Sequence, residues 1–371
     1  MAWYIGLMSG TSLDGVDGVL AQAEGGRLLR SAHHVHHPFP VALRAELLAL
    51  NRSGADELHR AALAANALAC AYAEVSQELL TRAGLTAEAV RAIGAHGQTV
   101  RHRPGEFDGH GYTLQLMNGA LLAERSGIDV VCDFRSRDVA AGGQGAPLVP
   151  AFHAALFARP GLDVAVLNLG GIGNLTLLPA NGPVRGFDCG PGNVLMDLWV
   201  SRHRAQPCDE GGRWAASGRV DAALLSALLS EPFFALPPPK STGRDLFHAE
   251  WLQRHLATHR GLAPQDVQAT LAELTAASAM AALQAEAPST TELLVCGGGA
   301  FNTHLVSRLS ALAGPATTVS STQNKGLAPD QVEALAFAWL AEAFVERRPG
   351  NLAAVTGAAG PRLLGALYPA G

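Results

Sequence analysis

Residues 3–21 read WYIGLMSGTSLDGVDGVLA, and this stretch carries the clearest signal of the fold. The apolar run at 3–7 and the alternating run at 16–21 predict two short strands, because alternation is typical of a strand with one buried face. The segment between them is rich in glycine, hydroxyl and carboxylate groups. The stretch therefore predicts a hairpin with a polar tip.

The hairpin tip carries groups that suit phosphate and magnesium. Glycines let backbone N–H groups approach phosphate oxygens, hydroxyls donate further hydrogen bonds, and an aspartate such as Asp14 can hold Mg²⁺ directly or through water. The tip is not a Walker A loop, because no G-x-x-x-x-G-K-[ST] pattern occurs and a strand follows it. An ordinary Gly/Asp turn is the alternative for this loop taken alone.

A second hairpin of the same kind is predicted in the other half of the chain. Residues 163–169 form an apolar run, 170–174 read GGIGN, and an apolar run returns at 175–178. Three glycines after a strand allow a nucleotide's phosphates to lie against the backbone, with a β-bulge as the alternative. Two matched hairpins indicate an internal duplication.

A third glycine-rich segment reads CGGGAFN at 296–302 and joins a predicted strand to a predicted helix. Asn302 is the expected N-cap of that helix, because an asparagine side chain there accepts a backbone N–H. The glycines before it can admit a flat adenine or ribose.

Asp188 is the candidate general base. It lies in GFDCGPGN at 186–193, directly before a turn and the predicted start of a helix near Val194. Such an aspartate is held by the backbone and can be aimed at a substrate oxygen. A turn-forming aspartate that bonds its own backbone is the alternative. Asp197, in the first turn of the helix, is interpreted as a structural acid.

The remaining pattern alternates strands and helices, which predicts an α/β protein. A strand is expected at 92–99, ending in His96-Gly97-Gln98, and long helices at 55–83, 264–286 and 331–346. With 371 residues, two lobes around a central nucleotide cleft are expected. We place the first lobe at 1–133, joined by 350–371, and the second at 134–349.

Composition excludes several classes of protein. Hydrophobic residues make up 48% and charged residues 16%, which excludes disorder. The net charge of -5 and the lack of a Lys/Arg-rich run argue against a nucleic-acid partner. The five cysteines include no C-x-x-C pair, so reduced thiols in a cytoplasm are expected. Neither a signal peptide nor a membrane span is predicted.

Two phosphate hairpins and a glycine-rich turn from strand to helix resemble the actin/hexokinase/Hsp70 superfamily. The chain as a whole resembles the anhydro-N-acetylmuramic acid kinase family, and the ordered motifs that carry this resemblance span nearly its whole length. They are GLMSGTSLDGVDGVL, IGAHGQTVRH, DFRSRDVAAGGQGAPLVP, NLGGIGNLT, GFDCGPGNVLMD, PKSTGRDLF and CGGGAFN.

The resemblance implies a cytoplasmic, homodimeric kinase that uses ATP and Mg²⁺. In that family 1,6-anhydro-N-acetylmuramic acid, ATP and water give N-acetylmuramic acid 6-phosphate and ADP. Asp188 matches the family's general base, while Cys189 stands where threonine is expected, and a thiol is the weaker hydrogen-bond donor. The resemblance makes Gly10 to Asp17 the ATP-phosphate loop, and the other two glycine turns are predicted from their residues to contact the nucleotide. The full predicted set is Gly10, Thr11, Ser12, Leu13, Asp14, Gly15, Val16, Asp17, Gly170, Gly171, Gly173, Asn174, Gly297, Gly298 and Asn302.

Four side chains are candidate sugar ligands. Arg135 can grip the lactyl carboxylate of a muramic acid, because an arginine fork matches a carboxylate, with a surface ion-pair cluster as the alternative. His96 and Gln98 end a strand and can line a cleft, although a buried, hydrogen-bonded histidine is also expected. Glu333 can bind a sugar hydroxyl or belong only to a capping box whose N-cap is Asp330.

Two further segments have both a functional and a purely structural interpretation. The cluster His33, His34, His36 and His37 suggests metal, but strand alternation would divide it between two faces and no carboxylate joins it, so a solvated strand is favoured. The segment 240–244, KSTGR, can form a closing lid or be a solvated loop.

Two rival functions remain open. A kinase of the same superfamily can act on an open sugar, in which case no water is added to the product. An Hsp70-like or actin-like ATPase would instead couple hydrolysis to a protein partner, and its activity would respond to a peptide but to no sugar.

Overall fold

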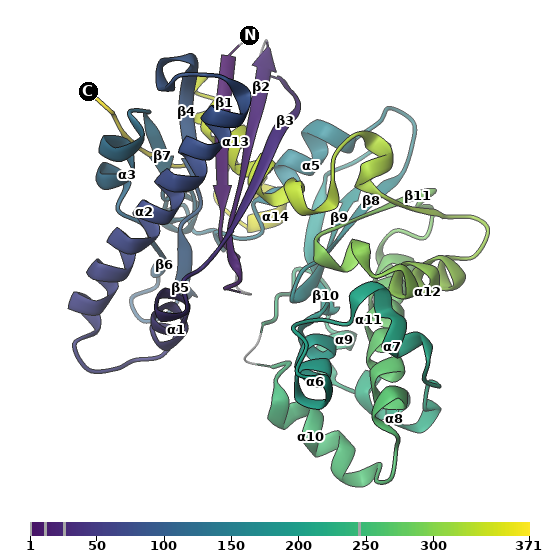
Figure 1. The fold of residues 1–371 in the computed structure, drawn as a ribbon. Helices are drawn as coiled ribbons and strands as arrows, with labels where there is room; N and C mark the ends of the chain where they lie inside the picture. Colours follow the sequence, from purple (N-terminus) through teal and green to yellow (C-terminus); the bar gives the residue numbers. More distant parts are fainter. Residues whose placement is uncertain (1, 11–12, 25–26, 244–245) are drawn as a thin grey trace. The chain divides into compact units, whose positions relative to one another are not determined.

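The computed structural model in Figure 1 describes residues 2–10, 13–24, 27–243 and 246–371. The chain divides into two compact units. The first contains Met1–Ala155 and Gln331–Gly371, and the second contains Leu156–Asp330. Both mix helices with sheets, which confirms the predicted α/β class.

The first unit is built on a six-stranded sheet in the order β13-β7-β4-β1-β2-β3. Its strands are β1 (Ala2–Met8), β2 (Gly15–Glu24), β3 (Arg27–Pro38), β4 (Val90–Ala95), β7 (Val130–Cys132) and β13 (Ala366–Tyr368), and a separate hairpin joins β5 (Gln98–Pro104) to β6 (Gly111–Leu116). Its helices are α1 (Val41–Ala49), α2 (Glu57–Ala83), α3 (Gly119–Ser126), α4 (Ser136–Ala140), α13 (Val332–Val345) and α14 (Ala353–Thr356). Helix α5 (Val149–Phe157) continues past residue 155.

The second unit has a five-stranded sheet in the order β10-β9-β8-β11-β12. Its strands are β8 (Val164–Leu169), β9 (Ile172–Leu178), β10 (Arg185–Pro191), β11 (Glu292–Cys296) and β12 (Thr318–Ser321). Its helices are α6 (Val194–Arg204), α7 (Arg213–Ala216), α8 (Ala222–Leu229), α9 (Pro232–Ala235), α10 (Ala249–Thr258), α11 (Pro264–Glu286) and α12 (Thr303–Ala313).

The two sheets share one plan. In each, a hairpin is followed by parallel strands: β1 pairs antiparallel with β2 and parallel with β4, while β8 pairs antiparallel with β9 and parallel with β11. Both predicted hairpins are therefore confirmed. Because carboxyl ends of parallel strands share one edge, the loops that follow them gather there.

Helices α2 and α13 cover opposite faces of the first sheet (Figure 1). A Cβ at Gly6 would lie 1.9 Å from the carbonyl oxygen of Ala334, and one at Gly94 would lie 2.0 Å from that of Phe337. Only glycine allows this close approach of α13 to the sheet. Gly18 pairs with Leu7 of β1, and its α-carbon faces Val75 of α2 instead of α13.

The predicted strand at 92–99 is wrong in its length. It breaks at Gly97, whose φ of 76° lies in the left-handed region, so that β4 ends at Ala95 and β5 begins at Gln98. A Cβ at Gly97 would lie 2.7 Å from the carbonyl oxygen of Leu116. Glycine therefore permits a sharp turn here that apolar periodicity does not reveal.

The predicted lobe boundaries also need correction. Residues 134–155 and 331–349 belong to the first unit, because α13 packs on β1 and β4 and the ring of Phe134 lies 5.7 Å from that of Phe337. Strand β13 pairs antiparallel with β7, with Tyr368 opposite Val130. The two ends of the chain thus complete one sheet.

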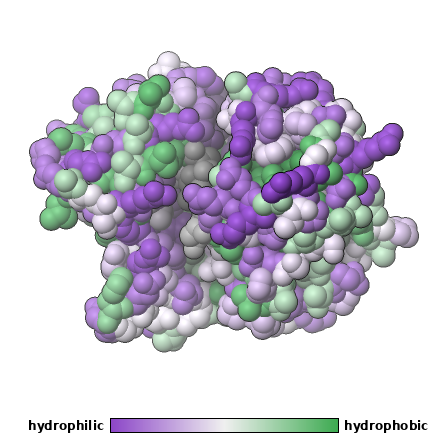
Figure 2. All heavy atoms as spheres, turned by 90° about the horizontal axis from the view of Figure 1, so that it is seen from below, coloured by the Kyte–Doolittle hydropathy of each residue, from purple (hydrophilic) through white to green (hydrophobic). Residues whose placement is uncertain are grey.

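Hydrophilic and hydrophobic side chains are interspersed on the face shown in Figure 2. Several exposed apolar side chains lie on α1 and α2, including Val41, Leu48 and Leu58. Within the described ranges, none of the helices has both the length and the apolar character needed to cross a bilayer.

Candidate active site

In the second unit, the glycine turn after β11 is pressed against the end of β8. Cys296 lies opposite Asn168 in the parallel pair. A Cβ at Gly297, whose φ is 77°, would lie 2.4 Å from Asn168 Oδ1, and one at Gly299 would lie 2.5 Å from Leu169 Cβ. Close packing, rather than ligand access, therefore requires glycine at these two positions.

The loop after β8 is fixed by the turn that precedes α6. The Asn193 N–H donates to the Gly170 carbonyl at 2.8 Å, and the Gly192 N–H donates to that of Gly171 at 2.9 Å. Asn193 Nδ2 also donates to the carbonyl of Leu169 at 2.9 Å. Asn193 was not predicted as a site residue, although its place after Gly-Pro-Gly was a signal.

Two glycines in this region have an open side. A Cβ at Gly170 would have its nearest neighbour, the Ile172 carbonyl oxygen, at 3.8 Å, and one at Gly298 would have Asn193 Nδ2 at 3.8 Å. A ligand can therefore approach the backbone at both positions. Gly173 differs, because a Cβ there would lie 3.2 Å from the sulfur of Cys189.

Asp188 lies in β10, next to an irregularity in the pairing with β9. Its Oδ2 accepts a hydrogen bond from the Thr242 N–H at 2.9 Å, and its own N–H donates to the Lys240 carbonyl at 3.1 Å. Burial raises the pKa of the Asp188 carboxyl to about 6, against the lowering effect of the Thr242 bond. A carboxylate with this pKa can accept a proton near neutral pH.

The segment 240–243 holds Asp188 in place, so it has a structural role as well as any role as a lid. Lys240 Nζ donates to the carbonyls of Phe233 and Phe234, at 3.2 and 3.1 Å. The buried Oγ1 of Thr242 has no hydrogen-bond partner among the described residues. The predicted lid residue Arg244 lies outside them. Lys240 and Thr242 are contacts of Asp188 that the sequence analysis did not identify.

In the first unit, the chain after β1 is tied to the chain after β4. Ser9 Oγ donates to the Gly97 carbonyl at 3.0 Å and shares a hydrogen bond of 2.9 Å with the hydroxyl of Tyr72. Burial raises the pKa of the Tyr72 hydroxyl well above its usual range, so the hydroxyl stays protonated. The contact therefore holds both loops together.

His96 and Arg135 form a pair beside these loops. Arg135 approaches His96 Nε2 with Nε at 3.3 Å and Nη2 at 3.0 Å, and its Nη1 donates to the Gly145 carbonyl at 2.8 Å. The other ring nitrogen, His96 Nδ1, lies 3.3 Å from the Ser9 carbonyl oxygen. Burial first, and then Arg135, lowers the pKa of His96 to about 3.

Two carboxylates also affect the pKa of Arg135. Burial lowers its pKa to about 10, while Glu333 and Asp138 oppose that shift. Asp138 is fully buried: its Oδ1 accepts from Asn351 and Thr356, and its Oδ2 accepts from the Gly145 N–H. This buried network replaces the surface ion-pair cluster considered for Arg135.

Glu333 lies in the first turn of α13, but the predicted capping box is wrong. The N-cap of α13 is Gln331, without a side-chain cap, because Asp330 belongs to the 3₁₀ turn Pro329–Gln331. Asn302 is confirmed as the N-cap of α12, where its Oδ1 accepts from the Leu305 N–H at 2.9 Å.

Gln98 contacts the first glycine loop. Its Nε2 donates to the Gly10 carbonyl at 3.1 Å, and its buried Oε1 has no hydrogen-bond partner among the described residues. Asp14 is exposed, whereas the side chains of Leu13 and Val16 belong to the core, so those two can offer a ligand only backbone groups. Thr11 and Ser12 lie outside the described residues.

Asp17 contacts two of the histidines of β3, so the prediction that no carboxylate joins these histidines is wrong. His34 Nε2 and His36 Nδ1 both lie on Asp17 Oδ1, at 3.2 and 3.0 Å, because neighbouring strands place these residues together. His37 points to Glu78 instead. Carboxylates therefore do join the histidines, yet no metal-binding group of three ligands occurs within the described part of the chain.

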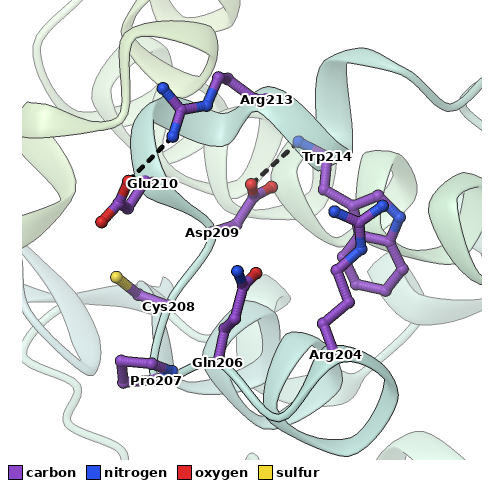
Figure 3. A pocket seen from close by; sticks show the side chains of 8 residues that line it. All are labelled: Arg204, Gln206, Pro207, Cys208, Asp209, Glu210, Arg213 and Trp214. Carbon is purple, nitrogen blue, oxygen red and sulfur yellow. Dashed lines mark hydrogen bonds and ion pairs between the residues drawn. The ribbon is translucent and has the colours of Figure 1, made fainter.

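A small cavity lies elsewhere in the second unit, between α6 and α7 (Figure 3). Its volume is about 220 Å³. Asp209 in its wall accepts from the backbone N–H groups of Trp214 and Ala215, and Glu210 pairs with Arg213. These carboxylates are occupied in holding the loop, and none of the predicted site residues lines the cavity.

The structure thus groups the predicted residues into two sets. In the first unit, His96, Gln98 and Arg135 lie together beside Ser9, which was not predicted, and Glu333 is close enough to affect the pKa of Arg135. In the second unit, Asp188 lies opposite Asn174, whose other neighbour across the sheet is Asn168. The glycine turns after β8 and β11 complete that set.

Comparisons with known proteins agree along the whole chain. The family model described as anhydro-N-acetylmuramic acid kinase matches residues 2–370. A Variovorax paradoxus protein named anhydro-N-acetylmuramic acid kinase is 61% identical over 372 residues, covering 99% of this chain and 99% of that protein. A Bordetella petrii protein of the same name is 62% identical over 371 residues, covering 99% of this chain and 96% of that protein.

Likeness to solved structures is weaker. Component A of (R)-2-hydroxyglutaryl-CoA dehydratase from Acidaminococcus fermentans is 10% identical, with a TM-score of 0.49, covering 91% of this chain and 97% of that one. A likeness at this level says nothing about what the present chain binds.

Proposed function

The chain belongs to the anhydro-N-acetylmuramic acid kinase family, and we propose that it converts 1,6-anhydro-N-acetylmuramic acid, ATP and water into N-acetylmuramic acid 6-phosphate and ADP. This reaction would serve peptidoglycan recycling and amino-sugar catabolism. The single observation that supports the chemistry best is Asp188, a half-buried carboxylate held by the Thr242 N–H, with a pKa raised to about 6.

Asp188 acts as the general base in this proposal. A water molecule loses a proton to the Asp188 carboxylate and forms a bond to the anomeric carbon of the sugar. The bond between that carbon and O6 breaks, and O6 forms a new bond to the γ-phosphorus while the bond from that phosphorus to the bridging oxygen of ADP breaks. The Thr242 N–H and the strand β10 fix the carboxylate, so that its orientation is set before the substrate arrives.

ATP supplies the phosphoryl group and Mg²⁺ offsets its charge. The open sides of Gly170 and Gly298 fit a nucleotide, because backbone N–H groups there can be approached without a Cβ in the way. We assign Gly10–Asp17, Gly171, Asn174 and Asn302 to nucleotide binding as well. Gly173 and Gly297, whose Cβ positions lie against protein atoms, are assigned to it only through their backbone groups. The exposed Asp14 is the proposed Mg²⁺ ligand.

Arg135 is proposed to bind the lactyl carboxylate of the sugar. Its charge persists at neutral pH, since its pKa stays near 10 despite burial. Glu333, whose negative charge raises the pKa of the same guanidinium, is proposed as a ligand of a sugar hydroxyl. A homodimer in the cytoplasm stays a prediction from the family resemblance.

Mass spectrometry of the product tests this proposal. Purified protein with ATP, Mg²⁺ and 1,6-anhydro-N-acetylmuramic acid in ¹⁸O-labelled water should give a product that gains one phosphate and one labelled oxygen. Asp188→Asn should reduce the rate at least about 100-fold, because it removes the proton acceptor while an amide oxygen can still accept the Thr242 N–H. Asp197→Asn, in the first turn of α6, serves as a matched control and should stay within about threefold of the unmodified rate.

Other products would favour a different function. Phosphate without labelled oxygen, on an open sugar, would indicate an ordinary sugar kinase in which Asp188 deprotonates a hydroxyl. ATP hydrolysis that responds to a peptide and to no sugar would indicate the Hsp70-like alternative.

A further inference from the structure

His96 lies where three parallel strands of the first sheet end side by side. Strands β7, β4 and β1 are neighbours, and the chain continues from them to Arg135, His96 and Ser9. His96 is therefore placed between the other two. It is 6% exposed, and the ring of Phe337 lies 4.7 Å from its own.

The contacts of His96 require one neutral tautomer. The Ser9 carbonyl at 3.3 Å from Nδ1 can only accept a hydrogen bond, so Nδ1 carries the proton. Nε2 then has a free lone pair, which accepts from the Arg135 guanidinium at 3.0 Å. Both ring nitrogens are used, so no nitrogen is left to bind a substrate.

The same contacts determine what remains of Arg135. A guanidinium has five N–H donors. Nε and Nη2 each direct one donor to His96, and Nη1 directs one to the Gly145 carbonyl. One N–H on each Nη atom is left, which is the pair that a carboxylate accepts in a bidentate contact.

We propose that His96 is a positioning residue and not a sugar ligand: it holds the Arg135 guanidinium in the orientation that leaves two N–H groups for the carboxylate of the substrate. This inference rests on the proposed function and revises the expectation that His96 itself contacts sugar. Ser9, whose carbonyl accepts from His96 Nδ1, is itself held in place, because its hydroxyl bonds with Tyr72 and with the Gly97 carbonyl.

Two substitutions of His96 distinguish the role of Nδ1 as a donor from the role of Nε2 as an acceptor. In His96→Asn the amide N–H can replace Nδ1–H toward Ser9, but the acceptor for Arg135 is lost. In His96→Gln the longer side chain places an amide oxygen where Nε2 lies, so the acceptor is kept. We expect the KM for 1,6-anhydro-N-acetylmuramic acid to rise about 10- to 100-fold in His96→Asn and to stay within about threefold in His96→Gln. The KM for ATP and the kcat should change little in either.

A second sugar shows whether the effect passes through the carboxylate. The 1,6-anhydro form of N-acetylglucosamine lacks the lactyl group, so the preference for the muramic sugar, measured as the ratio of kcat/KM values, should collapse in His96→Asn. A fall of kcat that is equal for both sugars would overturn the proposal, because His96 would then act on the reacting atoms. Unchanged kinetics in both variants would overturn it as well.

Nitrogen NMR of histidine-labelled protein tests the contact without catalysis and without a substitution at His96. In the unmodified protein, the His96 signals should show a protonated Nδ1 and a bare Nε2 from pH 5 to 8, and Arg135→Gln should shift the Nε2 signal. Absence of that shift would overturn the proposal. If the unmodified protein leaves the anhydro sugar unchanged, the proposed function fails, while the NMR result still decides whether His96 holds Arg135.

Discussion

The sheets of the two units share their strand order, but different kinds of residue follow their parallel strands. After β1, β4 and β7 of the first sheet come Ser9, His96 and Arg135, whose side chains form hydrogen bonds with one another or with backbone. After β8 and β11 of the second sheet come glycines, and backbone groups make most of the contacts. One sheet thus presents fixed side chains, suited to recognising a charged group, and the other presents backbone, suited to close approach.

The same contrast appears in two carboxylates. Asp138 in the first unit accepts three hydrogen bonds, from Asn351, Thr356 and the Gly145 N–H. Asp188 in the second unit accepts one from the Thr242 N–H. A well-bonded buried carboxylate stabilises the fold, whereas a poorly bonded one has a raised pKa and can take a proton.

The largest expected effect is on stability at Asp138. Asp138→Asn should lower the free energy of unfolding by about 3 kcal/mol, because the new NH₂ group would face donors instead of accepting from them. Urea unfolding measures this loss. Asp133→Asn is the matched control: Asp133 is exposed, with φ at 56°, a conformation that asparagine tolerates, so its substitution should change the free energy by less than about 0.5 kcal/mol. Equal losses of unfolding free energy in Asp138→Asn and Asp133→Asn would mean that the three hydrogen bonds of Asp138 do not stabilise the fold.

Neighbouring glycines sharpen the claim that the second sheet presents backbone. Gly299→Ala should cost about 2 kcal/mol of unfolding free energy, because its Cβ would lie 2.5 Å from Leu169 Cβ. Gly298→Ala should fold normally, since its Cβ would have space, yet raise the KM for ATP several-fold by blocking the backbone. Thermal unfolding and initial rates measure the two effects. An unchanged KM for ATP in Gly298→Ala would show that the nucleotide does not approach this side.

The third effect concerns pH. Because Asp188 must be deprotonated to act as a base, kcat/KM should fall about tenfold per pH unit below its pKa of about 6. For stability the sign is reversed from that of an ordinary ion-paired aspartate. The folded pKa lies above the ordinary value of 3.8, so the folded state binds the proton more tightly and stability falls as pH rises from 3.8 to about 6.

Comparison with Asp188→Asn isolates that effect on stability. The free energy of unfolding of the original protein, minus that of the variant, should decrease over the window from 3.8 to about 6 and be constant above it. A difference that increases with pH would mean that Asp188 is stabilised as an anion, which contradicts the proposed contrast with Asp138.

The smallest effect is expected at Cys189. Its side chain is 2% exposed and belongs to the core of the second unit, and burial raises the pKa of its thiol to about 12. Cys189→Thr, which introduces the residue expected from the resemblance, should therefore change kcat by less than about threefold, because successive side chains of a strand point to opposite faces and position 189 faces the core. Steady-state rates provide the test. A larger gain would mean that a hydroxyl at this position acts on the base or the metal.

Local patterns predicted the elements and much of the candidate site. The two hairpins, the α/β class and the Asn302 cap depend on residues that are close in sequence, so periodicity and capping chemistry reveal them. The position of Asp188 before a glycine turn was also visible in the sequence. The structure has these predicted features because local sequence preferences and the fold favour the same conformation there.

Contacts between distant segments could not be predicted in the same way. The packing of α13 against Gly6 and Gly94 joins opposite ends of the chain, and without it the lobe boundaries were misplaced. Asp17 meets His34 and His36 only because β2 and β3 pair in a particular register. Register depends on the turn and on which face of the sheet is buried, so it cannot be derived from the residues around Asp17 alone.

The route of the chain has a consequence for how the protein is made. The second unit is one continuous stretch, Leu156–Asp330, whereas the first needs α13 and β13 from the very end. A ribosome therefore synthesises every residue of the second unit before it makes the helix that covers Gly6 and Gly94. During synthesis β1 and β4 therefore have one apolar face uncovered until α13 follows, and the first unit is completed only after the second unit has been made.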